Sequence, residues 1–155
     1  MPPKSIAKRR RGKAAAPSLH SLLSQASRRV TTELRRVVGA EGLPVEFWRV
    51  LEVLADERGH TMSELAEQAG MQMPATSKLI DRMTEAALVQ RSADPNDQRR
   101  VILHVSDFGL AKFRALGADV ELHRSRLEST FSAKREEQLR ALLRDFIQAH
   151  RQAAE

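Results

Sequence analysis

A few charged and polar side chains in the middle of the chain have the types and spacing that nucleic-acid recognition needs. Asp97 and Arg99 stand two residues apart in the run DPNDQRR, so the carboxylate can orient the guanidinium through a charge-assisted hydrogen bond. A guanidinium carried on a turn fits the negative potential of a DNA minor groove. Upstream, Ser77 supplies a hydroxyl for a base edge and Lys78 a cation for a phosphate. These four residues predict a site that binds duplex DNA.

Two adjacent patterns predict the elements that position these side chains. Short helical patterns on either side of Gly70, between residues 61 and 87, are typical of a helix-turn-helix. The branched apolar stretches LVQRS and VILHVS then flank the Pro/Asn/Asp run and predict a β-hairpin with a long, charged tip. A helix-turn-helix followed directly by such a hairpin is the element order of a winged helix.

The second short helix is expected to lie in the major groove and to pack its apolar side on the domain. That buried side should consist of Thr76, Leu79, Ile80 and Met83, and Asp81 falls on or near the outer face. The residues predicted to contact DNA are Met73, Pro74, Ala75, Ser77, Lys78 and Arg82 on this helix and Asp97, Arg99 and Arg100 on the hairpin.

Longer amphipathic helices are predicted on both sides of the winged helix. Their patterns cover residues 18–38, 44–59, 106–131 and 134–150, with Ser106 as an N-cap and a break near Ser132. The fold class is therefore mainly α with a small β-hairpin wing. The expected division is a disordered basic arm over 1–17, a dimerisation helix over 18–42, the winged helix over 43–105 and C-terminal dimerisation helices over 106–155.

The net charge of +6 comes from one end of the chain. Residues 1–17 contain six basic side chains and no acid, and the 26 basic residues of the chain less these six equal its 20 acidic residues. Such an arm can neutralise phosphates and make DNA affinity depend on salt, or it can serve only as a solubilising tail. Any recognition by the nearly neutral winged helix must therefore depend on where a few side chains lie.

Several classes of function lack support in the sequence. There is no cysteine, which excludes disulfides, thiolate metal sites and thiol redox chemistry. The five histidines form no metalloprotease pattern, and no glycine-rich phosphate loop or Ser/His/Asp set appears, so we expect no enzyme activity, no cofactor and no metal. A metal site assembled from separate helices stays open. No apolar run approaches the roughly 20 residues of a membrane span, and the N-terminus lacks an apolar segment, which predicts a cytoplasmic protein without membrane contact.

The run LAEQAGMQMPATSKLIDRMTEAALVQRSADPNDQRRVILHVSDFGLAKF resembles the multiple-antibiotic-resistance regulator (MarR) family, and a looser likeness extends over residues 18–150. The segments DPNDQRR and VSDFG look like the family's wing motif and the start of its next helix. By this match Asp97 and Arg99 take the wing roles and Gly109 the family's glycine. Ser77-Lys78 takes the Thr-Arg position of the recognition helix.

The sequence departs from the family pattern at three places. Val105-Ser106 replaces Leu-Thr but keeps an apolar residue and a hydroxyl cap. Ala87 stands where the family usually has glycine, so the left-handed turn expected there is in question. Lys78 replaces arginine and offers a point charge without bidentate geometry, which favours phosphate over base contact.

The resemblance implies a homodimeric repressor whose first and last helices interlock and hold two winged helices over a pseudo-palindromic operator. Apolar periodicity alone favours an intramolecular helical bundle, and the resemblance reverses that preference. It also implies a cleft for a small aromatic or heterocyclic acid that lowers DNA affinity. The candidate ligand residues are His20, Ser24, Trp48 and Arg49.

Other interpretations of the same residues and of the whole chain remain open. Trp48 is equally typical of an ordinary core aromatic, and His20 of a half-buried cap or a surface residue. The chain as a whole could instead be a non-specific architectural DNA-binding protein that depends on the basic arm, or a winged-helix module for protein interaction. The architectural protein would lose little affinity when a specific site is scrambled, and the interaction module would not need Arg99.

Overall fold

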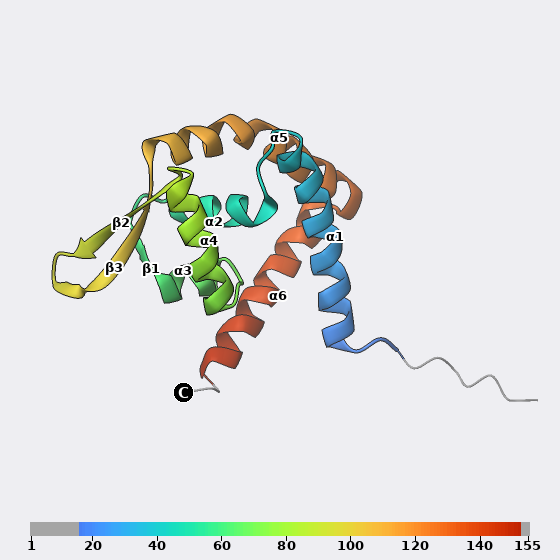
Figure 1. Ribbon diagram of the computed structural model, residues 1–155. Coiled ribbons are helices and arrows are strands. Elements are labelled where there is room, and N and C mark those ends of the chain that lie inside the picture. The colour runs from blue at the N-terminus through green and yellow to red at the C-terminus, as the bar shows by residue number, and fades with distance from the viewer. Residues whose placement is uncertain (1–15, 153–155) are drawn as a thin grey trace, which may run out of the picture.

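The computed structural model describes residues 16–152, except for the side chains of Leu127 and Thr130. Within them the chain forms six α-helices and three short strands, as Figure 1 shows. In order these are α1 (Leu19–Gly39), α2 (Val45–Leu54), β1 (His60–Thr61), α3 (Met62–Gln68), α4 (Met73–Glu85), β2 (Val89–Asp94), β3 (Asp97–Val105), α5 (Asp107–Phe131) and α6 (Ala133–Gln152). The mainly α fold with a small β wing is confirmed, whereas the predicted basic arm lies outside the described residues apart from Ala16 and Pro17.

The three strands form one antiparallel sheet in the order β1-β3-β2. The pairing of Asp94 with Asp97 closes the β2–β3 hairpin around Pro95 and Asn96. The strands therefore run further than the sequence suggested, and Arg99 and Arg100 belong to β3 instead of a long tip. The short β1, which pairs with β3 through His60 and Leu103, was not predicted.

The sequence predicted some helix ends correctly and others incorrectly. The break between α5 and α6 falls at Ser132, where φ is 74°, as predicted. Helix α2 ends at Leu54, before the predicted stop at Gly59, because Glu57 and Gly59 both adopt positive φ and turn the chain into β1. The left-handed turn after α4 is present although alanine occupies it, since φ of Ala87 is 56°.

The predicted N-cap Ser106 joins the wing to α5. Its Oγ accepts a hydrogen bond from the Gly109 backbone N–H at 2.9 Å and donates one to the Ala87 carbonyl at 2.5 Å. A Cβ at Gly109 would come within 2.2 Å of the Leu88 carbonyl oxygen, which leaves no room for any other residue. The VSDFG segment thus fixes α5 directly against the turn that follows the recognition helix.

The hydrophobic core lies among α2, α3, α4 and the sheet, and Val38 of α1 and Leu116 of α5 contribute to it. Its largest fully buried side chains include Leu51, Leu54, Leu65 and Leu103. The predicted buried face of α4 is confirmed, because Thr76, Leu79, Ile80 and Met83 are all buried.

The flanking helices are built differently from this core. Figure 1 shows α5 crossing above the winged helix, with α1 at the end of the molecule opposite the wing. None of the α6 side chains in the structure is buried. Large apolar side chains remain exposed on these helices: Leu19, Leu22, Val30, Phe108, Leu122, Phe131, Leu139, Leu142, Phe146 and Ile147. No helix within residues 16–152 is long and apolar enough to cross a membrane.

Candidate nucleic-acid interface

Helix α4 presents a continuous face to solvent. The predicted contact residues on it, Met73, Pro74, Ala75, Ser77, Lys78 and Arg82, are all exposed. The N-cap residue Gln72 makes no side-chain capping hydrogen bond, so the N–H groups of Met73 and Ala75 in the first turn are available to an anion, whereas Pro74 has none. This end of α4 therefore has the geometry for phosphate binding, with Ser77 and Lys78 one turn further along.

Arg82 lies at the other end of the helix, where it has a partner within the domain. Its guanidinium carbon is 5.3 Å from the centre of the Phe47 ring on α2, within the range of a cation–π contact. The contact holds the charge at the α2–α4 seam, so a role for Arg82 on DNA would have to be shared with this packing role.

The wing presents its arginines in two ways. Arg100 Nη1 lies 3.8 Å from Asp94 Oδ2 across the hairpin. No ion pair within residues 16–152 holds the exposed Arg99 guanidinium, because Asp97 Oδ1 accepts a 3.0 Å hydrogen bond from the Arg99 backbone N–H. Our expectation that Asp97 orients the guanidinium was wrong in this detail, since a short carboxylate reaches the N–H two residues on more easily. Asp97 shapes the turn, and the exposed Arg99 side chain has no acidic partner within residues 16–152.

A further ion pair, which sequence reasoning missed, joins the recognition helix to the wing. Arg91 Nη2 on β2 lies 2.5 Å from Asp81 Oδ1 on α4. Opposite charges ten residues apart carry no signal until the hairpin is known to fold back on α4. The pair ties the two predicted DNA-contacting elements together.

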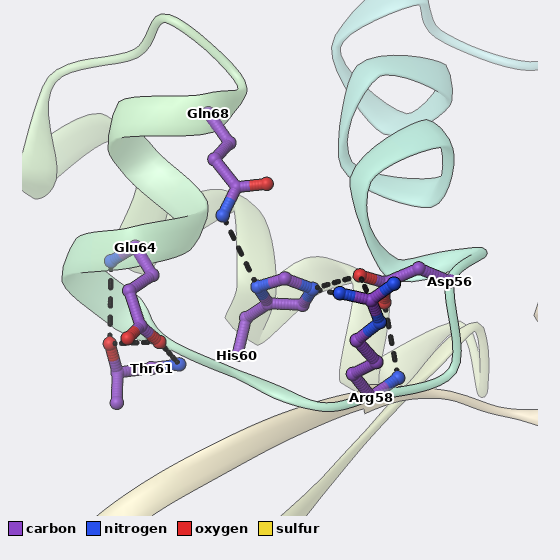
Figure 2. Close-up of polar contacts among 6 residues, drawn as sticks. All are labelled: Asp56, Arg58, His60, Thr61, Glu64 and Gln68. Atoms are coloured by element: carbon purple, nitrogen blue, oxygen red, sulfur yellow. Dashed lines mark hydrogen bonds and ion pairs between the residues drawn. The ribbon is translucent and has the colours of Figure 1, made fainter.

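A polar cluster around the buried His60, absent from our expectations, lies between the end of α2 and the start of α3 (Figure 2). His60 Nε2 donates to the Asp56 carboxylate, with both oxygens 3.0 Å away, and Nδ1 faces the Gln68 amide nitrogen at 3.4 Å. An N–H at Nε2 leaves Nδ1 as the acceptor for Gln68. These contacts connect the end of α2, the strand β1 and helix α3.

The carboxyl groups of this region are shifted toward their charged forms. Partial burial alone would raise the pKa of Asp56, but hydrogen bonds from the Arg58 backbone and the His60 ring outweigh burial and lower it. The pKa of Glu64 is lowered by hydrogen bonds that its carboxylate accepts from the Thr61 backbone and side chain. The backbone bond, together with the one that Thr61 Oγ1 accepts from the Glu64 N–H, forms a capping box at the start of α3. The base of the wing is thus held by charged hydrogen bonds.

The candidate ligand residues lie on two helices and point in different directions. The buried Trp48 indole stacks on Phe113 of α5, with ring centres 4.6 Å apart, and its Nε1 has no hydrogen-bond partner among the residues described. Arg49 Nη2 instead donates to the carbonyls of Ala69 and Gly70, at the turn between α3 and α4. On α1, His20 is exposed and Ser24 is half-buried.

The carboxylate and imidazole groups of the described residues form no metal-binding arrangement. In residues 16–152 no three histidine, aspartate or glutamate side chains come together in a way that could hold a metal ion. The polar groups in this region are instead used as helix caps, ion pairs and turn contacts.

A helix-turn-helix with an exposed second helix and an adjoining wing defines the chain as a winged-helix DNA-binding protein. A model of the MarR family matches residues 41–100. The homoprotocatechuate degradative operon repressor of Escherichia coli is 28% identical over 130 residues, which cover 84% of this chain and 88% of that repressor.

Solved structures give the same assignment. The MarR family transcriptional regulator SPO1453 from Silicibacter pomeroyi DSS-3 is 30% identical, with a TM-score of 0.71 over 83% of this chain and 94% of that one. NadR in complex with 4-hydroxyphenylacetate is 25% identical, with a TM-score of 0.76 over 94% and 97% of the two chains. The chain belongs to the MarR family and is a DNA-binding transcriptional regulator, a class of proteins without catalytic activity.

Proposed function

We propose that this protein is a repressor that binds a pseudo-palindromic operator as a homodimer and releases it when a small aromatic acid binds. The observation that carries the proposal is the pairing of an exposed recognition face on α4 with an Arg99 guanidinium that has no acidic partner within the described chain. One element suits the major groove and the other the adjacent minor groove. The predicted contact residues are those named above on α4 and the wing.

The exposed apolar side chains of the flanking helices support the homodimer. Leu142 and Ile147 on α6 are 66% and 54% exposed, and α6 meets its own winged helix through charges instead. Arg151 Nη2 lies 2.5 Å from Glu67 Oε1 on α3. A chain on its own would leave this apolar surface in water, whereas two-fold pairing buries it on both copies at once. Two winged helices related by that axis would read two half-sites.

The surroundings of α2 support an aromatic acid as effector. Trp48 and Phe113 form a stacked aromatic pair, and Trp48 Nε1, which has no hydrogen-bond partner among the described residues, offers a donor to a ligand that would enter beside the pair. A carboxylate that draws Arg49 toward itself would remove the hydrogen bonds to Ala69 and Gly70 and so loosen the α3–α4 turn. The names of the relatives agree with this chemistry, since one is a repressor of homoprotocatechuate degradation and another binds 4-hydroxyphenylacetate.

Selection of bound duplexes from a random DNA pool, with and without 4-hydroxyphenylacetate, tests the proposal. A two-fold symmetric motif should be enriched and should lose affinity when the acid is added. Enrichment of no motif, with affinity that depends on salt alone, would favour an architectural protein. An unchanged affinity and unchanged Trp48 fluorescence across a panel of aromatic and heterocyclic acids would overturn the effector.

A further inference from the structure

The ion pair between Asp81 and Arg91 has an origin in the packing of the sheet. Cross-strand partners lie on the same face of a sheet, and Arg91 is paired with Leu103, which is fully buried. Val89, two residues before Arg91, is also on this face and buried. Arg91 therefore starts from the core side of the sheet, at its edge, and its guanidinium emerges beside α4.

This origin makes the ion pair different from an ordinary surface salt bridge. The Arg91 side chain is 38% exposed, against 55% for Arg100, and its base is fixed by the sheet. Most exposed pairs contribute little because two long side chains must be ordered to form them. Here the sheet and the helix already hold both partners, so the pair sets the direction of the Asp81 carboxylate.

Asp81 lies on the stripe of α4 that is predicted to face DNA. It follows Ser77 by four residues and Lys78 by three, which are the spacings of neighbours on one helix face. A bare carboxylate there would be repelled by the DNA phosphates. Arg91 compensates this charge through Oδ1, and no hydrogen bond or ion pair in the described chain occupies Oδ2. One acceptor atom with a fixed direction remains.

We infer that Asp81, oriented by Arg91, is a specificity-determining residue that accepts a hydrogen bond from the N4 amino group of a cytosine in each operator half-site. The inference rests on the proposed function. Guanine and thymine present oxygen acceptors at the corresponding positions of the major groove, which a carboxylate repels. Adenine offers an amino group, but its N7 acceptor lies alongside, whereas cytosine has no acceptor beside N4. A single carboxylate oxygen thus matches cytosine.

The experiment compares selected motifs, and then measured affinities, for the wild type and variants of α4. Glu85 provides a matched control, because it is an exposed acid on the same helix and Glu85→Ala removes the same charge. In Asp81→Ala the preference for cytosine over guanine at one position per half-site should fall from about 5- to 150-fold to near none, with other positions unchanged. Asp81→Asn should shift that position toward adenine, since an amide binds adenine N6 and N7 together.

Arg91→Ala tests the positioning role. The variant should fold, but its preference for cytosine over guanine at that position should be weaker. Arg91→Lys should restore part of this preference, because the cation is kept. An unaltered base preference in both Asp81 variants would overturn the inference while leaving the proposed repressor intact. Enrichment of no motif by the wild type would overturn both. Loss of preference in Glu85→Ala equal to that in Asp81→Ala would also contradict it, because charge alone would then explain the effect.

Discussion

The winged helix and the helices that flank it differ in how much apolar surface a single chain can bury. The winged helix encloses Leu51, Leu54, Leu65 and Leu103 completely. Helix α6 has no fully buried side chain, and an ion pair between Arg151 and Glu67 links it to the winged helix. The core of the winged helix is buried within one chain, with Val38 of α1 and Leu116 of α5 contributing to it, whereas the exposed apolar face of α6 would be covered only in the proposed homodimer. In that proposal, DNA binding and assembly are divided between two parts of one small chain.

A charge placed on the exposed apolar face of α6 tests this division most directly. In Leu142→Lys the proposed homodimer should dissociate, and operator affinity should fall by about 10²- to 10⁴-fold because the two half-sites are no longer bound together. Analytical ultracentrifugation and DNA binding measure the two effects. Gln138→Lys, an exposed polar position on the same helix, is the control. A Leu142→Lys variant that remains dimeric would remove α6 from the interface.

A cavity in the winged helix should act on stability and not on assembly. Leu54 is 1% exposed, and Leu54→Ala should lower the free energy of unfolding by about 2–5 kcal/mol. Urea unfolding followed by circular dichroism gives this value. Leu139→Ala, at an exposed position of α6, should cost the isolated chain far less; equal losses at the two sites would contradict the comparison.

The wing offers a change that affects binding alone. Arg99→Ala should weaken operator binding by about 1–3 kcal/mol, because it removes an exposed guanidinium that has no acidic partner in the described part of the chain, and the melting temperature should stay the same. Arg114→Ala is the matched loss of one positive charge, since Arg114 pairs with Glu57 away from the wing tip. Affinity at physiological salt that is the same in all three proteins would remove the wing from the mechanism.

The turn after α4 stores a small strain within the winged helix. Ala87 has φ of 56°, a conformation that costs alanine about 1 kcal/mol, and Ala87→Gly should therefore stabilise the protein by about this amount. The neighbouring Ala86 has φ of −80°, where glycine brings only extra backbone entropy in the unfolded chain. Ala86→Gly should thus destabilise. Thermal unfolding of both variants decides the matter, and shifts of the same sign would contradict the argument.

The smallest expected effect concerns pH and the cluster of Figure 2. The folded pKa of Asp56 is lowered from its usual 3.8, so its stabilising contribution is present above that value and is lost as pH falls through the folded pKa. For so exposed a carboxyl it should amount to less than about 1 kcal/mol. Unfolding between pH 6 and 2.5 should depend less on pH in Asp56→Asn than in the wild type. Asp145→Asn, outside the cluster, is the control, and identical curves for Asp56→Asn and wild type would refute the shift.

Local periodicity explains which parts of the molecule could be predicted. The buried face of α4 follows from a 3.6-residue repeat, and the hairpin follows from two branched apolar runs around Pro95 and Asn96. The two-residue strand β1 escaped prediction because only its pairing with the distant β3, in which His60 lies opposite Leu103, makes it a strand. The Asp81–Arg91 pair, the His60 cluster and the capping role of Arg49 escaped for the same reason, since each needs tertiary proximity.

The predicted binding roles concern molecules other than this chain. The DNA contacts of Ser77, Lys78 and Arg99 and the ligand contacts of His20 and Trp48 stay predictions, and so does the role of the arm at residues 1–17. Their types and exposure are visible from one chain, whereas contacts with an operator or an effector depend on molecules outside it.

The hydroxyl of Ser106 has a mechanical consequence. One oxygen atom holds both the first turn of α5 and the carbonyl of Ala87, directly behind the recognition helix. Gly109 brings the two backbones too close for sliding. A tilt of α5 must therefore turn the end of α4 with it, as a rigid lever does. In the proposed homodimer, a small change in the angle between the subunits would therefore change the distance between the two recognition helices.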